Sequence, residues 1–89
     1  MEYNYRLKIL NGNIFLTPLE SVILETLIKM KGNPIQTKEM QEAINSKYGI
    51  GISLNNMKVH VCRINKKAKD LIKHRRCFGY YIDEEIKNR

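Results

Sequence analysis

Apolar and polar residues alternate at the start of the chain, which predicts a strand with one exposed face. The apolar members of this pattern are Tyr3, Tyr5, Leu7 and Ile9. An Asn-Gly pair follows at positions 11–12, and this pair tolerates the positive φ angles of a tight hairpin turn. Residues 13–16 supply the returning strand. We therefore expect a β-hairpin over residues 1–16.

A helix start signal follows this hairpin directly. Thr17 suits the N-cap, Pro18 suits the first helical position, and Glu20 completes a capping box. Apolar residues then recur at helical spacing, and Gly32 supplies an exit. The apolar positions of this first helix are Val22, Ile23, Leu27 and Met30.

A second helix is expected after the Asn-Pro pair at positions 33–34, which breaks the first. Thr37 is its expected N-cap, and the helix ends near Tyr48. Its buried stripe consists of Met40, Ala43 and Ile44. A short glycine-bearing segment, residues 49–52, leads to a third helix that is capped by either Ser53 or Asn55.

The third helix is expected to have one apolar face and one basic face. Its apolar residues are four, three, four and three positions apart: Met57, Val61, Ile64, Ala68 and Leu71. At 100° per residue, the opposite face carries Asn55, Val59, Cys62, Arg63, Lys66 and Lys73. Lys and Arg suit phosphates or guanine, Asn can read adenine, and Val can touch a thymine methyl group. This composition suits the major groove of DNA.

Residues 73–82 contain aromatic residues, a glycine and a run of β-formers, which predict a second hairpin with Arg75 and Arg76 near its tip. The expected fold class is therefore α+β. It is a winged helix-turn-helix domain with a short N-terminal hairpin, three helices and a C-terminal hairpin as the wing. We expect one domain over residues 1–89: the hairpin at 1–16, the three-helix core at 17–71, the wing at 72–82 and a tail at 83–89.

Positive charge is concentrated in one part of the chain. Residues 53–82 hold eight basic residues and one acidic residue, Asp70, whereas the chain as a whole has a net charge of +7. A helix that is merely solvated usually interleaves both signs to gain ion pairs. The missing acids therefore favour a surface that binds a polyanion.

Several classes of protein are disfavoured by the composition. No apolar run approaches the roughly 20 residues that cross a bilayer, and the N-terminus lacks the profile of a signal peptide. Cys62 and Cys77 have no partners at zinc-ligand spacing, and no catalytic constellation is visible. We therefore expect a cytoplasmic, nucleoid-associated protein that is not an enzyme and needs no cofactor, metal or membrane.

Four segments, in order, are similar to landmarks of a known family. Residues 16–20 (LTPLE) resemble its "LTPxE" opening of the first helix, and residues 32–40 (GNPIQTKEM) resemble the entry to its second helix. Residues 59–67 (VHVCRINKK) are similar to its "VHIxRLRxK" motif, and residues 76–82 (RCFGYYI) to its "RGxGYxh" wing motif. The family is the OmpR/PhoB-type winged-helix output domain of bacterial transcription regulators, and this chain resembles such a domain standing alone, without a receiver domain.

The resemblance implies a recognition helix in the major groove and a wing arginine, Arg76, near the adjacent minor groove. It also implies base contacts by Val59, Arg63 and Lys58, and a phosphate contact by Thr37. The chain departs from the family at three positions: Asn55 and Asn65 stand where the family has Arg, and Cys77 stands where it has Gly. The full set of expected DNA-binding residues is Thr37, Asn55, Asn56, Lys58, Val59, Cys62, Arg63, Lys66, Lys67, Arg75 and Arg76.

The expected function is sequence-selective binding of double-stranded DNA in transcriptional regulation, in a bacterium or a phage. Useful affinity requires two copies side by side on DNA, because one such domain contacts few base pairs. The alternative is a protein-interaction adaptor that docks RNA polymerase or a larger regulator through the same scaffold. A third reading, RNA binding, favours exposed aromatic residues for stacking, and the chain has only seven aromatic residues.

Overall fold

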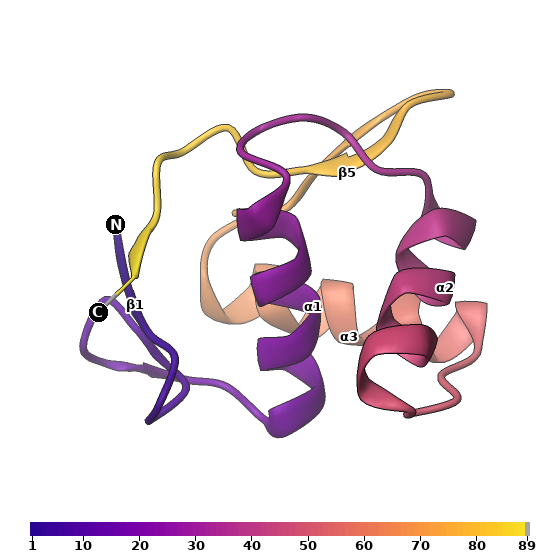
Figure 1. The fold of residues 1–89 in the computed structure, drawn as a ribbon. Coiled ribbons are helices and arrows are strands. Elements are labelled where there is room, and N and C mark those ends of the chain that lie inside the picture. The colour runs from indigo at the N-terminus through magenta and orange to yellow at the C-terminus, as the bar shows by residue number, and fades with distance from the viewer. Residues whose placement is uncertain (89) are drawn as a thin grey trace.

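The computed structural model describes residues 1–88, in which an N-terminal sheet precedes three helices and a C-terminal hairpin (Figure 1). The helices are α1 (Pro18–Lys29), α2 (Thr37–Tyr48) and α3 (Leu54–Lys67). The strands are β1 (Glu2–Asn4), β2 (Ile9–Leu10), β3 (Ile14–Phe15), β4 (Lys73–Arg75), β5 (Gly79–Tyr81) and β6 (Lys87–Asn88). This is the predicted α+β class, with a winged-helix-like layout in which β4 and β5 form the wing.

The N-terminal segment differs from the prediction of one strand through residues 3–9. The chain turns after Asn4, whose side-chain oxygen accepts hydrogen bonds from the backbone N–H groups of Arg6 and Leu7, each at 3.1 Å. Such local bonding by Asn competes with strand pairing. The turn leaves the Leu7 side chain 66% exposed, and β1 pairs back onto β2. The predicted Asn-Gly turn at residues 11–12 does join β2 to β3.

The predicted tail also contributes to this sheet. Strand β6 lies parallel to β1, with Lys87 opposite Glu2, so the strand order is β3-β2-β1-β6. The backbone N–H of Lys87 bonds to the carbonyl of Met1 at 2.9 Å, and the last strand of the chain lies beside β1 in Figure 1. The expectation that the sheet is reduced to one hairpin is therefore wrong. Residue 89 of the predicted tail lies outside the described residues.

The helices enclose a single apolar core, and the stripe predicted for α3 is confirmed. Every member of that stripe is buried, including Ala68 and Leu71, which lie just beyond the end of the helix. Tyr3 and Leu10 join this core from the sheet, and Ile82 joins it after the wing. In α2, Met40 and Ile44 are buried as expected, but Ala43 is exposed. The fully buried core residues of the helices include Ile23, Leu24, Met40, Ile44, Met57 and Ile64.

The helix caps follow the sequence signals in two of three cases. Thr17 and Glu20 form the predicted capping box of α1. Ser53 caps α3, because its hydroxyl oxygen accepts a hydrogen bond from the Asn56 N–H at 3.2 Å. The prediction for α2 is wrong: Thr37 is the first helical residue, and Gln36 occupies the N-cap without a side-chain bond.

Candidate nucleic-acid interface

The outward face of α3 carries most of the predicted site residues in exposed positions. The apolar stripe of this helix faces the core, so most of the residues between its members point to solvent. Helix α3 contains no Asp or Glu, and Val59 in the middle of its outer face is 46% exposed. The predicted residues exposed on α3, apart from its last residue, are Asn55, Asn56, Lys58, Val59, Cys62, Arg63 and Lys66.

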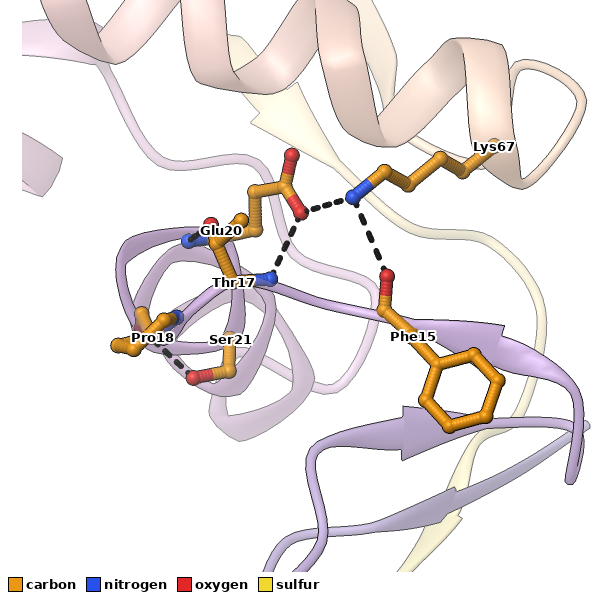
Figure 2. A network of polar contacts seen from close by, with 6 residues as sticks. All are labelled: Phe15, Thr17, Pro18, Glu20, Ser21 and Lys67. Atoms are coloured by element: carbon orange, nitrogen blue, oxygen red, sulfur yellow. Dashed lines mark hydrogen bonds and ion pairs between the residues drawn. The ribbon is translucent and has the colours of Figure 1, made fainter.

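Lys67, the last residue of α3, has a different environment from the other bases of this helix. Its ammonium group donates to Oε1 of Glu20 at 2.6 Å and to the backbone carbonyl of Phe15 at 3.1 Å (Figure 2). These bonds join the end of α3 to the start of α1 and to β3. The structure therefore separates Lys67 from the free bases of the outer face.

Glu20 is buried, with only 1% of its surface exposed. Burial raises the pKa of its carboxyl group, but the hydrogen bonds from Lys67 and from the backbone N–H of Thr17 lower it more. The net effect is a pKa below the ordinary value of a glutamate side chain. Figure 2 shows the carboxylate between its two donors, so this charge belongs to the folded scaffold and leaves the outer face of α3 without a competing acid.

The wing brings a second group of bases to the surface. Arg75 and Arg76 are both exposed, at the end of β4 and in the turn that follows it. The Arg75 guanidinium lies over the rings of Phe78 and Tyr81, at 5.9 and 6.0 Å from their centres, so it braces the hairpin. Within residues 1–88, Arg76 makes no such contact with an aromatic ring, and it lies in the turn itself. Lys73 belongs to β4, although the periodicity of the third helix assigned it to the outer face of that helix.

Asn65 connects α3 to the wing, a role that the sequence reasoning missed. Its side-chain amide donates to the carbonyl of Ile72 at 3.0 Å and accepts from the N–H of Ile72 at 2.8 Å. A primary amide can pair with a backbone peptide group in this way. In the sequence, the only indication of this role is an Asn near the end of a predicted helix, since Asn side chains often bond to nearby backbone groups.

The segment before α2 holds the wing from the other side. Ile35 and Tyr80 exchange two backbone hydrogen bonds, each at 2.9 Å, so a single antiparallel β-bridge joins Ile35 to β5. Thr37 lies two residues further on and is half-buried at the start of α2. The wing is therefore fixed to both helices of the helix-turn-helix unit.

The connection between α2 and α3 is set by side chains of α2. Asn45 accepts a hydrogen bond from the N–H of Ile52 at 2.8 Å, and Gln41 donates to the carbonyl of Ile52 at 2.9 Å. Gly49 ends α2 with a φ of +63°, a conformation that favours glycine. These contacts orient α3 against α2 and so determine which face of α3 is presented outward.

Within residues 1–88, no group of three or more His, Cys, Asp or Glu side chains is placed to hold a metal ion, and no helix is long and apolar enough to cross a membrane. Cys62 and Cys77 are free and exposed. A groove of about 650 Å³ lies between the end of α1 and residues 82–86, and it includes none of the predicted site residues.

Comparison with known proteins adds nothing to this geometry. No family model matches the chain, and no curated protein or solved structure matches it. The features that bear on function are therefore the exposed bases of α3 and the wing, and the contacts that hold these two elements together.

Proposed function

We propose that this protein binds double-stranded DNA sequence-selectively and acts in transcriptional regulation, on the nucleoid of a bacterium or on phage DNA in the cytoplasm. The observation that carries the proposal is the outer face of α3, which is exposed, basic and free of acidic residues. DNA carries two phosphate charges per base pair, so a face of this composition is attracted to it.

Helix α3 has suitable dimensions and chemistry for the major groove. Its 14 residues span about 21 Å, and the groove is about 12 Å wide, which admits one helix. Asn55 and Asn56 lie in the first turn, where recognition helices meet base edges. Arg63 and Lys66 lie further along the exposed surface, where they meet guanine or phosphate.

The wing supplies the second contact. With α3 in the major groove, the β4–β5 hairpin faces the adjacent minor groove, where arginine is favoured by the negative potential. Arg76 has the free guanidinium group at the turn, whereas Arg75 stacks on the aromatic residues of the hairpin. Two copies of the domain, bound side by side, would supply the affinity that a few contacted base pairs cannot.

A second candidate function is the adaptor that docks RNA polymerase or a larger regulator. The observation that favours it is the pair of exposed apolar side chains at the α2–α3 connection, Ile50 and Leu54, which are 40% and 39% exposed. Such side chains suit a protein partner. They lie beside the basic face of α3, so the same domain can hold DNA and a protein together.

The test compares three arginine-to-alanine variants for binding to an A+T-rich duplex and to a matched single strand at low salt. Arg63→Ala and Arg76→Ala remove one base each from α3 and from the wing. Arg6→Ala is the matched control, because Arg6 is exposed in the β1–β2 turn, remote in sequence from both elements. We expect each of the first two changes to weaken duplex binding by about 1–3 kcal/mol, and the control to leave it unchanged.

Equal weakening by all three changes would mean that binding depends on net charge alone. Absence of duplex binding by the unchanged protein would contradict the proposal and leave the adaptor function, which a pull-down with RNA polymerase then addresses.

A further inference from the structure

The wing turn exposes a large aromatic side chain. Phe78 is 59% exposed, and it is the residue between the turn and β5. Its ring is next to Arg75, whose guanidinium lies 5.9 Å from the ring centre, and Arg76 is two residues earlier. Residues 73–82 of the wing contain Lys73 in addition to these two arginines, and they contain no acidic residue. The surface around Phe78 is therefore apolar at its centre and cationic around it.

The backbone beneath Phe78 is held rigidly. Its N–H bonds to the carbonyl of Arg75 at 3.0 Å, which closes the turn. Gly79, with a φ of +106°, approaches the segment before α2 so closely that a Cβ there would lie 1.9 Å from the carbonyl oxygen of Ile35. Tyr80 then forms its two backbone bonds with Ile35. A side chain carried on this support keeps its position when it is pressed against a partner.

These properties point to one kind of partner surface. It must be negatively charged where it faces Arg75 and Arg76, and apolar where it faces the Phe78 ring. The minor groove of DNA has phosphates along its rims and stacked bases at its floor, and proteins that bind there insert apolar side chains between base steps. Figure 1 shows the tip of the β4–β5 hairpin above the start of α2, at the upper edge of the molecule and apart from the helix ribbons in this view.

We propose that Phe78 is a wedge that the wing presses between two base pairs of the minor groove, kinking the bound duplex. The inference rests on the proposed DNA binding and adds a specificity: the protein prefers sites with a pyrimidine–purine step such as TA under the wing, because these steps unstack most easily. At the wedged step the bend closes the major groove on the side of the duplex opposite the wing.

The experiment measures DNA bending and base unstacking separately from affinity. A duplex of about three helical turns carries a dye at each end for energy transfer, and 2-aminopurine replaces adenine at its TA steps. The variants are Phe78→Ala, which removes the wedge, and Phe78→Leu, which keeps an apolar wedge. Phe15→Ala is the matched control, because Phe15 is 68% exposed but lies in β3 of the N-terminal sheet. Thermal unfolding of each variant checks that it is folded.

With the unchanged protein we expect a bend of at least about 20° and brighter 2-aminopurine fluorescence. Phe78→Ala should bind the duplex at most about tenfold more weakly, because the free energy gained by burying the ring is partly offset by the cost of unstacking the bases. The complex with this variant should show neither the bend nor the rise in fluorescence. Phe78→Leu should retain part of the bend and part of the fluorescence rise. Phe15→Ala should retain both signals in full.

A duplex that is bound but stays straight, or that bends equally with Phe78→Ala, would overturn the wedge while leaving the proposed DNA binding intact. Failure of the unchanged protein to bind any duplex would overturn both.

Discussion

Glu20 is the residue in which capping, burial and charge are most closely coupled. Its carboxylate accepts from the N–H of Thr17 at 2.9 Å and from Lys67 at 2.6 Å, while its own N–H donates to the Thr17 hydroxyl at 3.2 Å. A buried carboxylate is tolerated when it is paired and hydrogen-bonded in this way. One side chain thus starts α1 and fixes the end of α3.

The stability of the protein should therefore depend on the ionisation of Glu20. Because the folded state lowers the pKa of this carboxyl group below its unfolded value of about 4.3, ionised Glu20 contributes stability that is fully present above about pH 4.3 and is lost as the pH falls through the folded pKa. Glu20→Gln should lower the free energy of unfolding by about 1–3 kcal/mol at pH 7, measured by urea denaturation. The difference from the unchanged protein should shrink below pH 4.

Glu39→Gln is the control for this measurement, because Glu39 is an exposed acid in the first turn of α2. A pH-independent difference for Glu20→Gln would show that packing, and not charge, accounts for its contribution.

Between elements, the junction of α3 with the wing depends on Asn65. Its side-chain amide bonds to both the N–H and the carbonyl of Ile72, the residue just before β4. These two bonds take the place of the backbone pairing that a neighbouring strand would give to Ile72. Ile72 is itself buried. An unpaired peptide group at that position would be costly, so the bonds hold the chain in one path.

We expect Asn65→Ala to loosen the wing without unfolding the helices. Hydrogen exchange at the Ile72 amide should become faster by about five- to tenfold or more, corresponding to the loss of about 1–1.5 kcal/mol of hydrogen bonding, and duplex affinity should fall with it. Exchange in the middle of α1 should be unchanged. The comparison variant is Asn13→Ala, since Asn13 is exposed in the β2–β3 turn. Unaltered exchange at Ile72 would show that the wing is held by the Ile35 pairing alone.

On the scale of the whole molecule, charge is divided between two regions. The exposed bases on α3 and the wing are Lys58, Arg63, Lys66 and Arg76, with Arg75 stacked on the wing aromatics and Lys73 bonded to the carbonyl of Asp70 at 3.3 Å. The acids lie elsewhere, in α1, α2, β1 and residues 83–85, except for Asp70 in the loop between α3 and β4. The molecule measures 30 × 26 × 21 Å, and α3 itself carries no acid that would repel DNA from its outer face.

This division predicts a steep dependence of duplex binding on salt. If about four to six bases neutralise phosphates, the logarithm of the binding constant should fall with the logarithm of the salt concentration at a slope of about −4 to −5. Fluorescence anisotropy between about 50 and 200 mM salt measures this slope. Lys66→Ala should reduce the slope by about one, whereas Lys67→Ala should not, because Lys67 is bonded to Glu20 and Phe15. A slope near zero would contradict an interface made of phosphate contacts.

The sequence by itself determined the features that depend on short-range spacing. The stripe of α3, the capping box at Thr17 and the Asn-Gly turn each involve residues within a few positions of one another, and each is present in the structure. The exposed basic face of α3 follows from the same spacing, because a buried stripe leaves the remaining residues outside. The predicted DNA contacts of these residues remain predictions.

Only the tertiary structure decided which residues far apart in the chain meet. Lys67 bonds to Glu20, 47 positions away, and this pairing separates it from the otherwise similar Lys66. Strand β6 pairs with β1 from the opposite end of the chain, although residues 83–89 carry no strand pattern. The physical reason is the same in both cases. The hydrogen-bonding groups of one segment bond to the segment that tertiary packing places beside them, and the local spacing of residues does not identify that segment.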